Sequence, residues 1–250
     1  MDLVIFFDGG KEFGAIYDIW NRVKRLLDES GIRWAEVYPE YSFDYCFCEK
    51  QVNTKNGEEK VGYSWCGGQC RWMTELKTRA INKYYKEHFS KDDMIIEYVG
   101  IAADELHRVK IPKRGGNTIQ KYPLVEWGYS ENDCFVGCYK AGFDWKEPDT
   151  DVELYQILDR VSCWCCSNKN LDELRNIYHN LPGYWEKLKE MQSKTELPFK
   201  KYGSIFELEE RFKQEDAEKE KKTAKKETKA TKKKKESNSY KQISMFDEEN

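Results

Sequence analysis

A short apolar segment followed by glycines and a helical pattern constrains the fold of this chain most strongly. Residues 3–7, LVIFF, end at Asp8-Gly9-Gly10, and the next segment carries apolar residues at helical spacing as far as Gly31. Residues 32–38, IRWAEVY, then have the composition of a second strand. The order strand, glycine turn, helix, strand is the repeating unit of a parallel α/β sheet. We therefore expect an α/β protein.

The remaining pattern predicts a third strand, a long loop and several helices. The segment from Cys70 to Phe89 has helical spacing, and residues 94–101, MIIEYVGI, form the third apolar strand. Its apolar half lacks polar alternation, as expected of a strand covered on both faces. Residues 103–122 contain Arg114-Gly115-Gly116 and are expected to form a loop. Further helices are expected to begin at Ser130, Asp151, Asn170 and Pro182.

Composition narrows the class of protein. The chain has 250 residues, of which 35% are charged and 39% are hydrophobic, and this balance predicts a soluble globular protein. No apolar run approaches the ~20 residues of a membrane span, and the acidic start MDLVIFFDGG is too short for a signal peptide. We expect a cytoplasmic protein without a membrane partner. Its net charge of -3 means that any contact with DNA must be local.

Four of the nine cysteines form two close pairs that favour a metal site. Three residues, two of them glycine, separate Cys66 from Cys70, and two residues separate Cys163 from Cys166. Sulfur-only ligation suits zinc or an iron–sulfur cluster. In a reducing compartment, nine cysteines indicate metal binding or reactive thiols rather than disulfides. Cys165 is a substitute ligand or redox thiol, and the competing interpretation is that all these cysteines pack as small apolar groups.

Several motifs in a fixed order resemble one known family. They are GIAADELHR at 100–108, YPLVEWG at 122–128, CWCC at 163–166 and LPGYWEKLKEMQ at 181–192. Over roughly residues 1–195 the chain is similar to the phosphoadenosine phosphosulfate reductase family, within the PP-loop adenine-nucleotide α-hydrolase superfamily. This resemblance implies a Rossmann-like parallel sheet with flanking helices and a helical, cysteine-containing C-terminal part. It also implies that an adenine nucleotide, ATP or a sulfonucleotide, binds above the carboxyl ends of the strands.

The resemblance also bears on the chemistry of this chain. It favours an iron–sulfur cluster over zinc at the four cysteines. Relatives in the superfamily reduce sulfonucleotides, adenylate substrates with release of pyrophosphate, or incorporate sulfur into nucleic acids.

The phosphate-binding loop of that family, SGGKDS after the first strand, is altered here. The only candidate is DGGKEF at 8–13. If this segment is the loop, Gly9, Gly10 and Lys11 bind phosphate, although Asp8 places a carboxylate against the anion. If FFDGGKEF instead matches the family's second strand, which a D-T-G-x-E-F-type motif follows, the phosphate-binding strand is missing upstream. We favour this second alignment, which a truncated start, a split gene or a partner that supplies the loop would explain.

Charged residues near the predicted strand ends are the candidate nucleotide contacts. Arg71 and Lys77 lie on the helix after the first cysteine pair, and Arg108 follows the third strand. These cations suit phosphate or sulfate. Asp104 and Glu105 are candidates to hold Mg²⁺ or to orient a ribose, and together with Arg108 they are our candidate catalytic residues. The alternative is a solvated cluster of ion pairs.

The C-terminal segment predicts a tethered peptide. We expect a domain over residues 1–212, a charged Lys/Glu-rich linker over 213–240, and a disordered tail whose residues 241–250 carry the motif Gln242-Ile243-Ser244-Met245-Phe246. The motif resembles the Q-x-S-[LM]-F peptide with which bacterial replication and repair proteins bind the sliding clamp, so Gln242, Met245 and Phe246 are the candidate contacts. Lys232–Lys235 are candidates to contact DNA phosphates.

Two hypotheses of function follow from the sequence. The first is a phosphoadenosine phosphosulfate reductase-like enzyme that uses an adenine nucleotide and a cysteine-bound iron–sulfur cluster in sulfur or nucleotidyl-transfer chemistry, linked to nucleic acid. Reduction to sulfite is disfavoured, because no cysteine follows Cys166. The second is a non-catalytic adaptor, stabilised by zinc or a cluster and tethered to the DNA sliding clamp.

Overall fold

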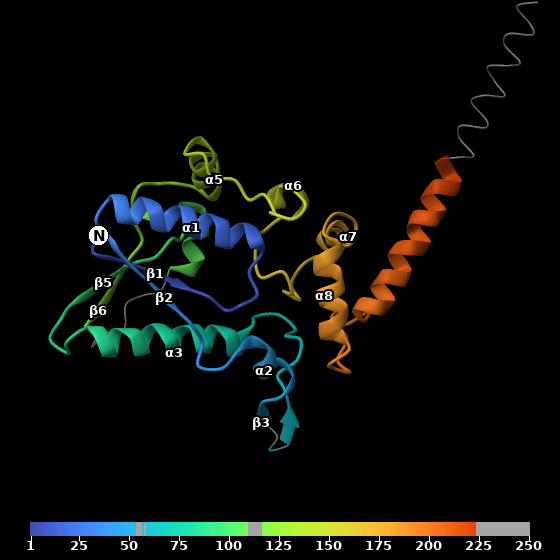
Figure 1. The fold of residues 1–250 in the computed structure, drawn as a ribbon, viewed down its shortest axis with the longest axis horizontal. Coiled ribbons are helices and arrows are strands. Elements are labelled where there is room, and N and C mark those ends of the chain that lie inside the picture. Colours follow the sequence, from blue (N-terminus) through green and yellow to red (C-terminus); the bar gives the residue numbers. More distant parts are fainter. Residues whose placement is uncertain (54–56, 58, 110–116, 224–250) are drawn as a thin grey trace, which may run out of the picture. The chain divides into compact units, whose positions relative to one another are not determined.

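A computed structural model describes residues 1–53, 57, 59–109 and 117–223 (Figure 1). The chain divides into two compact units, Met1–Lys187 and Leu188–Asn250, and each is described by itself. The first unit is a mixed α/β structure with short parallel sheets and flanking helices.

The predicted strand–helix–strand unit is confirmed. Strand β1 (Leu3–Phe7) pairs in parallel with β2 (Arg33–Val37), and helix α1 (Gly14–Glu29) connects them. Trp20 of α1 is buried and stacks on Phe6 of β1, with 4.8 Å between the ring centroids. This apolar contact fixes α1 against one face of the pair.

A second parallel pair follows helix α3 (Arg71–His88), which the sequence predicted. It consists of β5 (Ile95–Tyr98) and β6 (Thr118–Lys121), with the 3-10 helix η1 (Ala103–Arg108) between them in sequence. Strand β6 lies in the stretch expected to be a loop, so that prediction was wrong at its end. The strand sequence TIQK has one strongly apolar residue and gives no strand signal of its own.

The described strands pair only as β1–β2, β3–β4 and β5–β6, so no continuous sheet joins them. The expectation that β5 is covered on both faces was wrong, since Ile96 is 45% exposed and Tyr98 57% exposed. Among the described strands, parallel pairing is therefore confined to two separate pairs, and a Rossmann-like sheet is not confirmed.

The remaining elements of the first unit surround these pairs. Helix α2 (Phe43–Cys48) precedes the antiparallel hairpin of β3 (Gln51–Asn53) and β4 (Glu59–Val61). The later helices are α4 (Pro123–Glu126), α5 (Glu131–Lys140), α6 (Leu154–Ile157), α7 (Leu171–Asn180) and α8 (Pro182–Gln192), the last of which runs into the second unit.

Local sequence signals explain several helix starts. The capping boxes of Ser130 with Asp133 and of Asn170 with Glu173 are both formed, as predicted. The helix expected over 151–160 is only the single turn α6, because Asp151 has a positive φ of 56° and the chain becomes extended at Leu158.

The second unit contains the end of α8 and a helix over residues 205–223. Its buried apolar residues are Leu188, Met191, Phe199, Ile205, Leu208 and Phe212. The helix continues into the stretch expected to be a linker, while residues 224–250, including Gln242, Met245 and Phe246, lie outside the described residues. No helix of the described chain is both long enough and apolar enough to cross a membrane.

Candidate functional site

Three loops meet beyond the carboxyl end of β1, and we call them the three-loop cluster: residues 8–13, 66–70 and 163–169. The backbone N–H of Trp164 donates to the carbonyl oxygen of Lys11 at 3.0 Å. The Ser167 hydroxyl donates to the carbonyl of Cys66, and the Asn168 amide donates to the carbonyl of Gly68 at 3.0 Å. Loops that lie far apart in sequence are thus joined by hydrogen bonds.

The first cysteine pair is polarised by its neighbours. The sulfur atoms of Cys66 and Cys70 lie 3.8 Å apart, and the Trp72 indole N–H donates to Cys66 Sγ at 2.9 Å. The hydrogen bond from Cys70 and then that from Trp72 lower the pKa of Cys66 to about 7. The same donation to Cys66, together with burial, raises the pKa of Cys70. Cys66 is therefore the thiol that gives up its proton first.

The second pair is held more deeply. Burial raises the pKa of Cys163 to about 12, and its Sγ donates to Glu12 Oε1 at 3.6 Å. Cys165 is 4% exposed, and burial raises the pKa of its thiol as well. Cys166 begins the turn that closes on Lys169, whose N–H donates to the Cys166 carbonyl.

The four predicted cysteines lie on two adjoining loops of the three-loop cluster, residues 66–70 and 163–169. Their sulfur atoms suit a zinc ion or an iron–sulfur cluster. Within the described ranges, however, no three or more His, Cys, Asp or Glu side chains are grouped closely enough to hold a metal ion as they stand. The contact between Cys163 and Glu12 explains part of this, because that sulfur faces a carboxylate. Ligation by all four sulfurs requires their side chains to turn.

The lysine of the first loop is enclosed by aromatic rings. Lys11 Nζ lies 5.4 Å from the Phe43 ring centroid and 5.2 Å from that of Trp164, and it pairs with Asp44 at 2.8 Å. Its charge is thus already balanced within the site.

One N–H of this loop and two at the start of α1 are also engaged internally. Asp8 Oδ1 accepts from the Gly10 N–H at 2.7 Å. At the start of α1, the Ala15 N–H donates to Glu147 Oε1 at 2.8 Å, and the Gly14 N–H donates to the Tyr184 hydroxyl at 2.9 Å. Carboxylates of the chain therefore take the positions that a phosphate would take at a helix start. The N–H groups of Gly10, Gly14 and Ala15 are therefore already engaged by side chains of the chain itself.

Two more of the predicted cations, Arg71 and Lys77, lie on α3. Lys77 is exposed, and its Nζ lies 6.0 Å from the centroid of the Phe7 ring at the end of β1. Arg71 is exposed at the first position of α3, next to Cys70. Both residues therefore lie beside the three-loop cluster.

The predicted catalytic residues on η1 are bound to one another and to neighbouring elements. Glu105 accepts from Arg108 and, at 3.0 Å, from Arg160, while Asp104 accepts from the Glu131 N–H at 3.0 Å. In the described structure these contacts join η1 to α5 and to the segment after α6. They match the predicted alternative of an ion-pair cluster.

Sequence reasoning missed two charged residues of the site, Glu12 and Lys169. Glu12 lies inside DGGKEF, and burial raises the pKa of its carboxyl. Lys169 is 2% exposed, its Nζ donates to Ser162 Oγ at 3.3 Å, and burial lowers its pKa. The only sequence signal for them was position, because Glu12 lies within DGGKEF and Lys169 lies three residues after CWCC.

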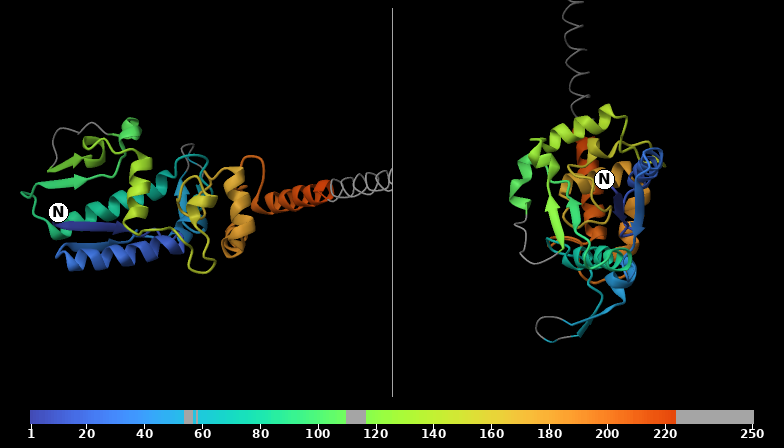
Figure 2. Two further views of the ribbon diagram at one scale, coloured as in Figure 1. Left: turned by 90° about the horizontal axis from the view of Figure 1, so that it is seen from above. Right: turned by 90° about the vertical axis from the view of Figure 1, so that its left-hand side faces the viewer.

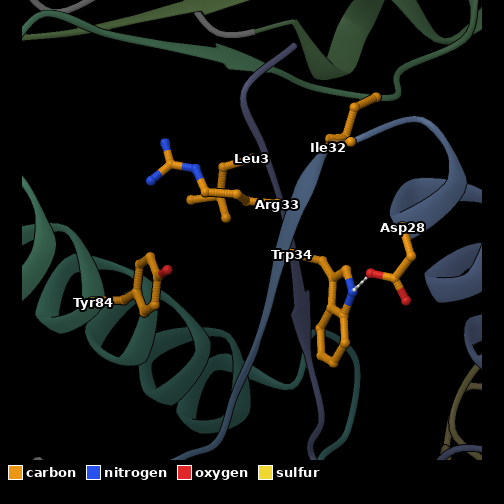
Figure 3. Close-up of a pocket in the computed structure, with 7 residues that line it drawn as sticks. Leu3, Asp28, Ile32, Arg33, Trp34 and Tyr84 are labelled. Carbon is orange, nitrogen blue, oxygen red and sulfur yellow. Dashed lines mark hydrogen bonds between the residues drawn. The ribbon is translucent and has the colours of Figure 1, made fainter.

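A shallow pocket of about 380 Å³ lies at the opposite end of the strands (Figure 3). Leu3 and Arg33 border it at the amino ends of β1 and β2, and Tyr84 borders it from α3. Trp34 donates to Asp28 at 2.8 Å on its rim. None of the predicted site residues lines this pocket.

Comparison with known proteins gives no match: no family model, no curated protein and no solved structure is similar to this chain.

Proposed function

We propose that this chain is a phosphoadenosine phosphosulfate reductase-like protein with a Rossmann-like parallel sheet. It uses an adenine nucleotide and a cysteine-bound iron–sulfur cluster in sulfur or nucleotidyl-transfer chemistry linked to nucleic acid. The observation that supports this proposal is the meeting of both cysteine loops with residues 8–13 at the carboxyl end of a parallel strand. In open α/β sheets, ligands bind at this end of the strands.

In this proposal the cysteines hold the cluster and nearby cations hold the nucleotide. Cys66, Cys70, Cys163 and Cys166 are the ligands, and the bound cluster supplies electron transfer or a Lewis-acid iron. Trp72 donates to the sulfur of Cys66 and thereby stabilises its thiolate.

The nucleotide contacts follow from the cations beside the cluster. Lys77 and Arg71 attract the anionic groups of the nucleotide. Lys11 contributes less, because Asp44 already balances its charge. On η1, Asp104 and Glu105 are the proposed Mg²⁺ or ribose contacts, and Arg108 with them completes the proposed catalytic set.

The metal assignment is tested by anaerobic purification followed by absorption spectroscopy and by analysis of iron, sulfide and zinc. We expect stoichiometric iron and sulfide, with a large loss in Cys66→Ser and in Cys163→Ser. The matched control is Cys138→Ser, a half-buried cysteine of α5, which should keep the metal. A colourless protein without iron or zinc would contradict the assignment, whereas zinc alone would support the structural-metal alternative.

Nucleotide binding is tested separately by calorimetry with ATP and with a sulfonucleotide. We expect Lys77→Ala to weaken binding on the order of tenfold, as the loss of one charge-assisted contact predicts. Lys83→Ala is the control, because Lys83 is an exposed lysine of the same helix. If neither nucleotide binds the chain, the catalytic proposal is wrong.

A second candidate function is a non-catalytic adaptor tethered to the DNA sliding clamp. The observation that favours it is that Asp8 accepts from the Gly10 N–H within DGGKEF and Glu147 accepts from the Ala15 N–H at the start of α1, so these two donors are not free for a phosphate. The proposed clamp contacts are Gln242, Met245 and Phe246.

The adaptor proposal is tested by a pull-down with purified clamp. Changing Gln242 and Phe246 together to Ala should abolish binding of this chain to the clamp. Binding that survives both changes would contradict the tail assignment, and ATP pyrophosphatase activity of this chain alone would contradict the adaptor.

A further inference from the structure

Strand β1 has a free edge that carries backbone hydrogen-bonding groups. Its only neighbour among the described strands is β2. The Asp8 N–H donates to the Val37 carbonyl at 3.0 Å, so the backbone groups at this position point to β2. Because the direction alternates along a strand, the N–H and C=O groups of Leu3, Ile5 and Phe7 point to the opposite side. That side offers a template for another strand.

Strand β5 has a free edge of the same kind. The N–H groups of Ile95 and Val99 donate to β6-side carbonyls at 2.7 and 2.9 Å. By the same alternation, the backbone groups of Ile96 and Tyr98 point away from β6. In the described chain, β6 is the sole strand neighbour of β5.

Helix α3 contacts both strands that have a free edge, β1 and β5. Lys77 of α3 approaches Phe7 at the end of β1, and Tyr84 borders the pocket beside Leu3 at its start, so α3 runs opposite to β1. The Tyr85 hydroxyl donates to Glu97 of β5 at 3.0 Å. Strand β5 follows α3 after a short turn and therefore runs parallel to β1. Figure 2 shows the two strand pairs apart, with α3 extending along both.

The width of α3 limits the space between the pairs to about one strand. A helix with its side chains is about 10–12 Å across, and neighbouring strands lie about 4.8 Å apart. Because α3 contacts β1 on one side and β5 on the other, the distance between these two strands is about two inter-strand spacings. That distance leaves space for one strand between them. Strands β1 and β5 are not neighbours themselves, because no ladder joins them.

The face of the second pair opposite α3 is apolar and bare. Glu97 faces α3, so the alternate residues of β5 face away from it. Met94, Ile96 and Tyr98 on this side are 69%, 45% and 57% exposed, and Ile119, the β6 partner of Ile96, is 40% exposed. Parallel pairs are normally covered on both faces, and two strands alone do not sustain a sheet.

We propose that one apolar strand from a segment outside residues 1–250 inserts between β1 and β5 as a parallel strand, and that the helix following it covers the face of Ile96, Tyr98 and Ile119. The stretches of residues 1–250 that the structure does not describe contain no uninterrupted apolar run longer than two residues, so they do not supply such a strand. The inserted segment is therefore an apolar strand, a loop and an amphipathic helix.

The inserted strand would complete the site. Its carboxyl end lies beside Phe7 and Lys77, and the loop after it adjoins the three-loop cluster. That this loop binds the phosphates of the nucleotide rests on the proposed function, whereas the docking of the strand does not.

Amide hydrogen exchange of the full chain, resolved by residue with NMR, tests the free edges. We expect the amides of Ile5, Ile96 and Tyr98 to exchange much faster than those of Val4 and Glu97, which point to β2 and β6. Equal protection of both sets in the isolated chain would show that the edges are already paired and would overturn the proposal.

The docking itself is tested with a synthetic peptide of five Val and Ile residues, the loop Ser-Gly-Gly-Lys-Asp-Ser and an amphipathic helix. We expect the peptide to protect Ile5 and Ile96 together, without nucleotide. Ile96→Lys should weaken its binding on the order of tenfold, because it places a charge in the apolar contact. Val61→Lys is the control, since Val61 is an exposed apolar residue of the β3–β4 hairpin.

Each remaining outcome is decisive. No binding at about 1 mM peptide, protection of one edge only, or equal loss in the Val61 variant would overturn the proposal. A stable dimer of this chain with Ile5 and Ile96 protected would identify a second copy as the occupant instead. Docking without nucleotide binding would retain the strand proposal and contradict the proposed function.

Discussion

A buried carboxylate, Glu147, fixes the start of α1. It is 2% exposed, it accepts from the Ala15 N–H at 2.8 Å, and its second oxygen accepts from the Tyr184 hydroxyl at 2.8 Å. The same hydroxyl accepts from the Gly14 N–H at 2.9 Å. The first turn of α1 is thus capped by residues more than a hundred positions away, while its N-cap residue Phe13 gives no side-chain cap.

Replacing Glu147 with Ala should lower the free energy of unfolding by about 2–3 kcal/mol, because it leaves the buried N–H of Ala15 and the half-buried hydroxyl of Tyr184 without an acceptor. Chemical denaturation monitored by tryptophan fluorescence measures this change. Asp149→Ala is the matched control, since Asp149 is exposed two residues away. Equal midpoints for the Glu147 and Asp149 variants would show that the cap contributes little.

Caps show how far sequence reasoning reaches at the scale of single residues. The pairs Ser130 with Asp133 and Asn170 with Glu173 are three residues apart, so a local pattern predicted both. The contact between Glu147 and Ala15 joins residues 132 positions apart. Nothing in the local sequence marks such a pair, because its geometry arises only when the elements pack.

At the scale of elements, Glu36 joins β2 to α1. Its carboxylate accepts from Lys24, Tyr38 and Trp20, at 2.9, 2.6 and 2.7 Å respectively. These hydrogen bonds lower the pKa of Glu36 from its ordinary value of 4.5 to about 2, with Lys24 contributing most. The charged form is therefore favoured in the folded state.

The lowered pKa of Glu36 predicts how stability changes with pH. The stabilisation is present above the unfolded pKa of about 4.5 and is lost as the pH falls towards 2, because protonation of Glu36 removes the charge that its three donors stabilise. Glu36→Gln should therefore lose less stability than the wild-type chain between these pH values in urea denaturation. Glu40→Gln, at an exposed position nearby, should keep the wild-type pH dependence. A wild-type slope in the Glu36 variant would refute the prediction.

Strand β5 shows why elements are easier to predict than their neighbours. Its apolar run predicted a strand correctly, but the expectation of cover on both faces was wrong. A run of apolar residues records that a face needs burial, and it does not record which chain provides it. Strand β6 illustrates the converse, because it pairs through its backbone while its residues carry little apolar signal.

At the scale of the whole molecule, the three-loop cluster depends on contacts between distant segments. The spacing within each cysteine pair could be read from the sequence. That the pairs adjoin is due to Ser167 and Asn168, whose side chains bind carbonyls about a hundred residues earlier. Glu12 and Lys169 lie in the site because the same loops pack together, and the spacing of the cysteines does not predict them.

The second unit is organised around one polar side chain in an apolar core. Gln192 is 4% exposed; its oxygen accepts from the N–H groups of Phe199 and Ile205 at 3.1 and 3.4 Å. Its nitrogen donates to the carbonyls of Thr195 and Leu197 at 3.1 and 2.9 Å. One amide thus satisfies the backbone of the turn between α8 and the helix over residues 205–223.

Gln192→Leu should destabilise the second unit by at least about 2 kcal/mol, because Leu fills the space but leaves the buried N–H groups of Phe199 and Ile205 unpaired. All eight tryptophans precede Leu188, so their fluorescence reports on the first unit only. Amide exchange over residues 199–212 is the appropriate measurement, and it should accelerate in the variant. Gln156→Leu is the control, since Gln156 is exposed in the first unit. Unchanged exchange over 199–212 in the Gln192 variant would mean that water replaces the amide at no cost, and that the apolar contacts of Leu188, Ile205 and Phe212 alone hold this unit together.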